Sequence, residues 1–317
     1  MMKRATAISA ALACSALVLP LASCRPARSA DAARDPGTVV LRLAESLNAE
    51  HPSAQAGDYF ASLVHERSGG RIRIRSYYGG KLGTPEQVIA QVQFGGIAMA
   101  RVNSLELAEA VPRMREILEA GIYSGGAAMM GRVEAFGEAI ADACQRERLT
   151  PLVFYFPDIR CVYGDVAHFR SVADFEGVRI GAVQSGILKD ALESLGSVPV
   201  NLVSADTYKS LRSGYIHARE TTFSEFVLSD DYPFVANVSL SRYLASPDLI
   251  VMSPEVLNDL SDQDRRLIAL CARDSYDYQK GLLEKFHLEW IPRLEADGKD
   301  VFWEDDEFKS EIRAAIE

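Results

Sequence analysis

The stretch Tyr78–Asn103, YGGKLGTPEQVIAQVQFGGIAMARVN, predicts a turn, a helix and a strand in succession. It follows Arg71–Tyr77 (RIRIRSY), where charged and apolar residues alternate with the period of a β-strand. Thr84 is a favourable N-cap, and Pro85 suits the first helical position, where a backbone N–H is not needed. Two glycines end the helix, and Ile97–Val102 is expected to form the next strand. The stretch therefore indicates one β-α-β unit of an α/β protein.

Strands and helices are expected to alternate along the rest of the chain, which favours mostly parallel sheets covered by helices. The expected strands are Val39–Leu43, Leu152–Phe156, Val178–Val183, Val198–Leu202, Tyr215–Ala218 and Leu249–Met252. The expected helices are Ser53–Arg67, Met129–Arg146, Ile187–Leu195 and Ala205–Arg212. A long helix is expected to begin after Ser261, which forms a capping box with Asp264, to run towards Trp290 and to end by Gly298.

The first residues have the pattern of a bacterial secretory signal. Two cationic residues precede a short apolar run, and Leu21-Ala22-Ser23-Cys24 fits a lipobox, in which a peptidase cuts before the cysteine and the cysteine carries lipid. Residues 1–23 are therefore expected to be a lipoprotein signal peptide, and the polar residues 24–37 a flexible tether. Ordinary cleavage near Ser29-Ala30, which leaves a free protein without a lipid anchor, is the alternative.

Composition narrows the partners of the mature protein. The chain has 317 residues and a formal net charge of −10 at pH 7, which argues against nucleic acid as a partner. Beyond the signal and Cys24, the cysteines are Cys144, Cys161 and Cys271. Three cysteines allow at most one disulfide, and we expect buried, small apolar residues instead of a disulfide framework.

Motifs for catalysis or metal binding are absent from the sequence. Its five histidines are isolated from one another and from cysteines at metal-ligand spacing. The sequence also has no G-x-S-x-G, P-loop or G-x-G-x-x-G pattern. We therefore expect a binding protein without catalysis, metal or cofactor.

Four segments together resemble the solute-binding proteins of tripartite ATP-independent periplasmic (TRAP) transporters. Tyr78–Asn103 is the first, and Leu43-Ala44 followed by His51-Pro52 is the second. Asp174–Ser185 (DFEGVRIGAVQS) and Ser204–Glu220 (SADTYKSLRSGYIHARE) are similar to two further motifs of that family. The resemblance covers roughly Val39 to Val301.

The resemblance implies a two-lobed periplasmic-binding-protein fold, with a ligand cleft between the lobes and a long connecting helix. Residues 38–157 plus 247–285 are expected to form one lobe, and 158–246 plus 286–317 the other. The implied function is an extracytoplasmic receptor that captures a small polar organic solute, expected to bear a carboxylate, and delivers it to TRAP permease membrane subunits. With lipid on Cys24, the receptor is expected to be anchored to the extracytoplasmic face of a bacterial membrane.

The resemblance also implies where the solute binds. Arg160 matches a family arginine that faces the cleft, and we expect it to be the main charged anchor. The family's other carboxylate-binding arginine falls at Gly181, which predicts a vacancy in the cleft. Further contacts are expected from Glu45, Arg101, Asn103, Gln184, Ser204, Glu220 and Thr221.

These residues limit the ligand without naming it. Arg160 alone can hold one carboxylate, and Glu45 or Glu220 can oppose an amino group or accept hydrogen bonds from hydroxyl groups. An uncharged polar ligand stays open because of Gly181. Two other functions also stay open, a lipid-anchored sensing module for a signalling protein and a periplasmic enzyme on the same fold.

Overall fold

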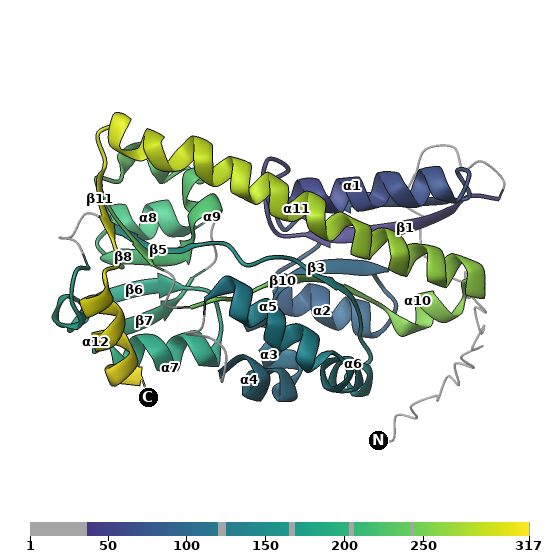
Figure 1. Ribbon diagram of the computed structural model, residues 1–317, viewed down its shortest axis with the longest axis horizontal. Helices are drawn as coiled ribbons and strands as arrows, with labels where there is room; N and C mark the ends of the chain where they lie inside the picture. The colour runs from purple at the N-terminus through teal and green to yellow at the C-terminus, as the bar shows by residue number, and fades with distance from the viewer. Residues whose placement is uncertain (1–36, 120–124, 165–168, 203–205, 242–243, 317) are drawn as a thin grey trace, which may run out of the picture. The chain divides into compact units, whose positions relative to one another are not determined.

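The computed structural model describes residues 37–119, 125–164, 169–202, 206–241 and 244–316 (Figure 1). The predicted signal peptide, Cys24 and all but the last residue of the predicted tether lie outside the described residues, as does Ser204.

The first sheet has five strands in the order β2–β1–β3–β10–β4. The strands β1 (Val39–Glu45), β2 (Ile72–Tyr77) and β3 (Met99–Asn103) are parallel to one another. β10 (Asp248–Met252) is antiparallel to both of its neighbours, β3 and β4 (Thr150–Phe154).

The second sheet has six strands in the order β11–β9–β5–β8–β6–β7. The strands are β5 (Arg160–Gly164), β6 (Arg179–Ala182), β7 (Val198–Asn201), β8 (Ala218–Thr222), β9 (Asn237–Ser241) and β11 (Asp300–Trp303). β5 is antiparallel to both β8 and β9. Both sheets are mixed, and most of their strands are parallel as predicted. One strand in each sheet, β10 in the first and β5 in the second, runs opposite to the others. The chain passes directly from β4 into β5 of the other sheet, and from β9 back into β10, so no crossover helix forces these strands to be parallel.

The helices near the opening stretch begin where the sequence predicts. In α2 (Pro85–Gln93), the Thr84 hydroxyl accepts from the Gln87 N–H at 3.4 Å, and Gln87 Oε1 accepts from the Thr84 N–H at 3.1 Å. This reciprocal pair is a capping box. α1 (Pro52–Arg67) begins after His51, whose Nδ1 accepts from the Ser53 N–H at 3.1 Å.

The predicted long helix is α11 (Asp262–Ala296), and Ser261 caps it by accepting from the Asp264 N–H at 3.1 Å. Figure 1 shows α1 lying beside α11. Cys271 of α11 belongs to an apolar cluster with residues of the first sheet, and Leu294 of the same helix belongs to a cluster with residues of the second sheet. α11 therefore packs against both sheets.

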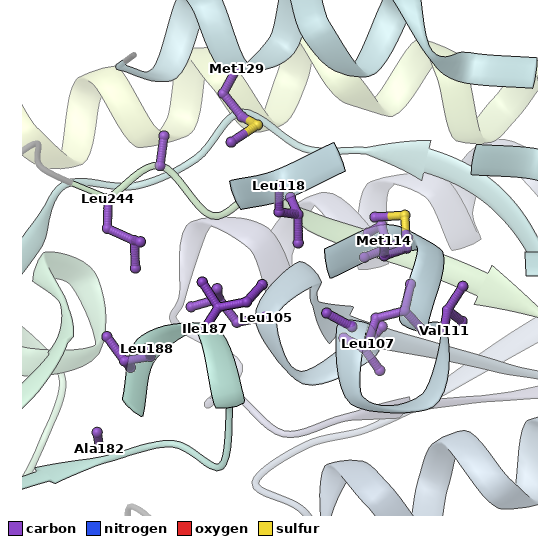
Figure 2. Close-up of a cluster of buried hydrophobic side chains, with 14 of the residues drawn as sticks. Leu105, Leu107, Val111, Met114, Leu118, Met129, Ala182, Ile187, Leu188 and Leu244 are labelled. Carbon is purple, nitrogen blue, oxygen red and sulfur yellow. The ribbon is translucent and has the colours of Figure 1, made fainter. Parts of the chain in front are cut away.

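Short helices fill the space beside the two sheets. They are α3 (Ser104–Ala110), α4 (Pro112–Glu119), α5 (Gly126–Ala135), α6 (Gly137–Arg146), α7 (Gly186–Ser194), α8 (Thr207–Arg212), α9 (Phe223–Val227), α10 (Pro254–Asn258), α12 (Asp306–Ile316) and the 3₁₀ turns η1 (Val172–Phe175) and η3 (Tyr232–Phe234). Figure 2 shows part of the largest apolar cluster, where Leu105 of α3, Met129 of α5 and Ile187 of α7 are all buried. This cluster joins elements from both sheets.

Three sequence predictions need correction. The single helix predicted at Met129–Arg146 is two helices, because Phe136, with φ −105° and ψ 14°, interrupts the helical backbone. The strand predicted at Tyr215–Ala218 begins three residues later, as β8, because Gly214 and Ile216 still bond back to α8. The strands β5, β9 and β11 were not predicted. β5 and β11 lack a clear period of two, whereas β9 (NVSLS) alternates polar and apolar residues, so its signal was present in the sequence.

Candidate functional site

A cavity of about 270 Å³ lies where the loop after β1 meets the strands β5 and β8 of the second sheet and the helix α9. The loop after β1 contributes Ser46, Asn48 and His51 to the lining. The elements β5, β8 and α9 contribute Tyr163, Arg219 and Glu225. The alternation of side chains along β8 decides which residues reach it. Tyr163 lies opposite Arg219 in the antiparallel register, so the two side chains share one face of the sheet.

Arg219 is the cation of this cavity, and its side chain is almost fully buried. Its Nη1 donates to the backbone carbonyl of Leu202 at 3.0 Å, and its Nη2 has no hydrogen-bond partner. A buried guanidinium nitrogen without an acceptor is costly, and such exceptions need an explanation. A bound anion is the acceptor that best matches a guanidinium.

Unsatisfied polar atoms gather at this cavity. Among the described residues, eight side chains have a buried polar atom without a partner, and four of the eight line the cavity. The four atoms are His51 Nε2, Thr207 Oγ1, Arg219 Nη2 and Asp231 Oδ1. Because native interiors leave few such groups unpaired, their concentration indicates a site that a polar ligand completes.

His51 is held in one orientation by the start of α1. Its Nδ1 accepts the Ser53 N–H, so in the neutral ring the proton is on Nε2. Burial lowers the pKa of His51, an effect opposed by the nearby carboxylates of Asp248, Asp158 and Glu225. The neutral imidazole therefore presents an N–H donor that has no acceptor in the protein.

Three acidic residues in and after α9 also line the cavity. Asp231 Oδ2 accepts from the Tyr163 hydroxyl at 2.8 Å, and burial raises the pKa of the Asp231 carboxyl. Glu225 Oε2 accepts from the Thr221 hydroxyl at 2.8 Å. Asp230 also lines the cavity. The described lining therefore combines one arginine with three carboxylates.

The chain matches proteins of a known family over most of its length. The family model of DctP, bacterial extracellular solute-binding protein family 7, matches residues 43–317. The chain belongs to this family. It is 23% identical to a solute-binding protein of Chromohalobacter salexigens over 236 residues, which are 74% of this chain and 70% of that protein.

Solved TRAP periplasmic solute-binding proteins share the fold of this family member. One from a Bradyrhizobium species has a TM-score of 0.80 at 25% identity, with 87% of this chain and 92% of that chain covered. One from Chromohalobacter salexigens has a TM-score of 0.82 at 23% identity, with 87% and 92% covered. The predicted two-lobed α/β periplasmic-binding-protein fold is thereby confirmed.

Arg160 and Glu220, two of the predicted site residues of this solute-binding protein, pair with each other. Arg160 Nε and Nη2 donate to the two carboxylate oxygens of Glu220 at 2.6 and 2.5 Å, and Arg160 Nη1 donates to the Ser246 hydroxyl at 3.0 Å. Both side chains are buried. Neither lines the 270 Å³ cavity, because Glu220 lies on the face of β8 opposite to Arg219.

Three other predicted residues form a second polar cluster. Arg101 Nε donates to Glu45 at 2.8 Å, and its Nη1 donates to Asp248 at 3.1 Å. Asn103 donates to the same Asp248 oxygen at 2.9 Å and caps α3. Glu45 and Arg101 line a separate cavity of about 10 Å³, which has room for about one water molecule.

The remaining predicted positions have different outcomes. Thr221 lines the large cavity. Gln184 is exposed and accepts from Asn201 at 3.1 Å. Ser204 lies outside the described residues. The roles of all the predicted site residues in binding stay predictions.

Gly181 does not leave the predicted vacancy. It lies opposite Arg219 in the parallel register of β6 and β8. A Cβ atom at Gly181 would lie 2.9 Å from Ile216 Cδ1, 3.2 Å from Leu202 Cδ2 and 3.6 Å from Arg219 Cδ. The side chains of Ile216 and Leu202 therefore fill this space.

Other classes of site find little support in the part of the chain that is described. It holds no group of three or more His, Cys, Asp or Glu side chains that suits a metal ion. The three cysteines Cys144, Cys161 and Cys271 are free and buried. Within the same residues, none of the helices combines the length and apolar character needed to cross a bilayer.

Proposed function

We propose that this receptor captures a small, polar, carboxylate-bearing solute in the 270 Å³ cavity and delivers it to the membrane subunits of a TRAP permease. The unpartnered Nη2 of the buried Arg219 carries this proposal. A carboxylate placed there gains a charge-assisted hydrogen bond and gives a buried cation its counterion.

Known ligands of similar proteins support a carboxylate. The Bradyrhizobium protein was crystallised with α/β-D-galacturonate, and the Chromohalobacter salexigens protein with D-glucuronate. Both ligands bear one carboxylate and several hydroxyl groups. The cavity of this chain, at about 270 Å³, lies just below the usual range of about 300–1,000 Å³ for ligand sites, which suits a solute of this size or smaller.

The lobe boundaries are part of the same proposal. Lobe I (38–157 plus 247–285) contains all strands of the first sheet, and lobe II (158–246 plus 286–317) contains all strands of the second. Residues from both line the cavity, so closure of the lobes about a hinge brings His51 towards Arg219 and its neighbours. The receptor binds without chemical change and, with lipid on Cys24, is held at the extracytoplasmic face of the membrane.

Native mass spectrometry of protein purified from the cell envelope tests this function. We expect a retained small molecule that contains a carboxylate and is released unaltered. A second measurement is the radius of gyration in solution scattering, which should decrease when that molecule is added back. Release of a chemically altered molecule, or binding without compaction, would contradict the proposal.

A further inference from the structure

We propose that His51 determines specificity by donating its Nε2–H to an uncharged oxygen of the solute, and that the site selects hydroxylated monocarboxylates over dicarboxylates and amino acids. This inference rests on the proposed function, because it assumes that a solute carboxylate binds Arg219. It goes further because it names His51 as the residue that binds an uncharged oxygen of the solute, away from the carboxylate.

The hydrogen bonds of His51 define which of its ring nitrogens carries the proton. The hydrogen bond from the Ser53 N–H occupies Nδ1 and fixes that nitrogen as an acceptor. Nε2 then carries the proton of the neutral ring, and it has no acceptor among the described residues. An N–H donor of this kind is completed by a ligand oxygen and is left unpaired by an ammonium group, which has no lone pair.

The charges in the cavity lining are unequal. Arg219 is the one lysine or arginine among the described residues that line the cavity, and Glu225, Asp230 and Asp231 are its carboxylates. One solute carboxylate can pair with Arg219. A second would face acidic side chains without a cation, and a buried charge without a partner is strongly disfavoured.

The cavity lining also needs donors from the solute. Asp231 Oδ1 is buried without a partner, and Glu225 also lies on the cavity wall. A hydroxyl group can accept from His51 Nε2–H and at the same time donate to a carboxylate. Hydroxyl groups therefore satisfy both kinds of unpaired atom in this lining, whereas an ammonium group satisfies the carboxylates alone.

Matched compounds test the selectivity. The probes are D-erythronate, D-gluconate and D-galacturonate, each compared with the dicarboxylate of the same skeleton, namely meso-tartrate, D-glucarate and galactarate. The amino counterparts are 2-amino-2-deoxy-D-gluconate and 2-amino-2-deoxy-D-galacturonate. By isothermal titration, we expect the bound monocarboxylate to have a Kd about a hundredfold or more below that of its dicarboxylate.

Each outcome of this comparison has a consequence. Equal or tighter binding of a dicarboxylate or amino counterpart overturns the inference and leaves the receptor function standing. Absence of binding by every acid overturns the inference and the proposed solute class together.

Substitution of His51 tests its role directly. His51→Asn keeps a side-chain acceptor for the Ser53 N–H, so the cap of α1 is preserved while the Nε2 donor is lost. For the monocarboxylate that binds most tightly, we expect the Kd to rise about tenfold, with the Tm of the ligand-free protein unchanged. The matched control is His65→Asn, an exposed histidine on the same helix. Wild-type affinity in His51→Asn would overturn the assignment.

Discussion

Replacing Arg219 with glutamine is the most direct test of the binding site. Glutamine is neutral and shorter, so the cavity loses its guanidinium while the backbone of β8 is unchanged. Arg219 is 1% exposed, and one of its nitrogens has no partner in the protein. We therefore expect the substitution to act on solute binding much more than on folding.

The magnitude follows from this burial. Removing one member of a buried, hydrogen-bonded charge pair costs about 2–5 kcal/mol, which corresponds to a roughly 30- to 5,000-fold rise in Kd. In the empty protein, loss of the bond to the Leu202 carbonyl costs about 1 kcal/mol and is offset by removal of the unpartnered nitrogen. The Tm of the ligand-free protein should change by about 3 °C or less.

Arg160→Gln should behave in the opposite way. It leaves the fully buried Glu220 without its two hydrogen bonds from Arg160, and breaking such a pair costs about 3–5 kcal/mol of folding stability. For a chain of this size, the Tm should fall by about 6–15 °C. The sequence-based prediction, in which Arg160 is the main anchor, instead expects lost affinity with little change in Tm.

Isothermal titration and thermal unfolding of both variants decide between the two arginines. The compound retained by the purified wild-type protein is the titrant, and the control is Arg212→Gln, which changes an exposed arginine on α8. Binding by Arg219→Gln within threefold of wild type would refute the role of Arg219 as the anchor. Weak binding by Arg160→Gln at an unchanged Tm would identify Arg160 as the anchor.

Three further perturbations test other parts of the structure. Gly181→Ala places a methyl group 2.9 Å from Ile216 Cδ1 and 3.2 Å from Leu202 Cδ2, so we expect urea unfolding to show a loss of about 1 kcal/mol. Solute affinity should stay at the wild-type value, because the methyl group would lie at an ordinary contact distance of 3.6 Å from Arg219 Cδ, and a large loss of affinity would contradict this packing. Burial raises the pKa of Glu106 to about 7, so its ionisation disfavours the folded state, and the free energy of unfolding should fall as the pH rises from about 4.5 to 7. In chemical denaturation, this fall with pH should be smaller for Glu106→Gln, and an equal fall in both proteins would disprove the assignment. Cys24→Ser should move the mature protein from the membrane fraction to the soluble fraction, and equal retention of both proteins in the membrane would rule out lipidation of Cys24.

The local signals in the sequence predicted many helix starts well. Thr84 and Pro85 begin α2, and Ser261 begins α11, as expected. These predictions succeed because a cap depends on residues within one helical turn of one another. The direction of β5 and β10 was missed, because it depends on which sheet the chain enters, and no local pattern encodes that choice.

The sequence also failed to predict which arginine lines the cavity. The sequence placed a strand at Tyr215–Ala218, which left Arg219 beyond its end and gave no prediction for its side chain. In the structure, β8 covers Ala218–Thr222, so Arg219 and Thr221 face the cavity while Glu220 faces Arg160. Arg160 was expected to bind because it matches a family arginine, and that match carries no information on its pairing with Glu220.

The sequence by itself determined the α/β class, the membership of a solute-binding family and the presence of a helix long enough to pack against both sheets. These follow from periodicity, caps and motifs, which are properties of residues close together in the chain. Only the tertiary structure decided that Arg160 pairs with Glu220. It also decided that His51, Arg219 and Asp231 line one cavity, each with a buried polar atom that has no partner. Those partners come from separate strands and loops, and the pairing of a buried charge is fixed by strand register and side-chain face.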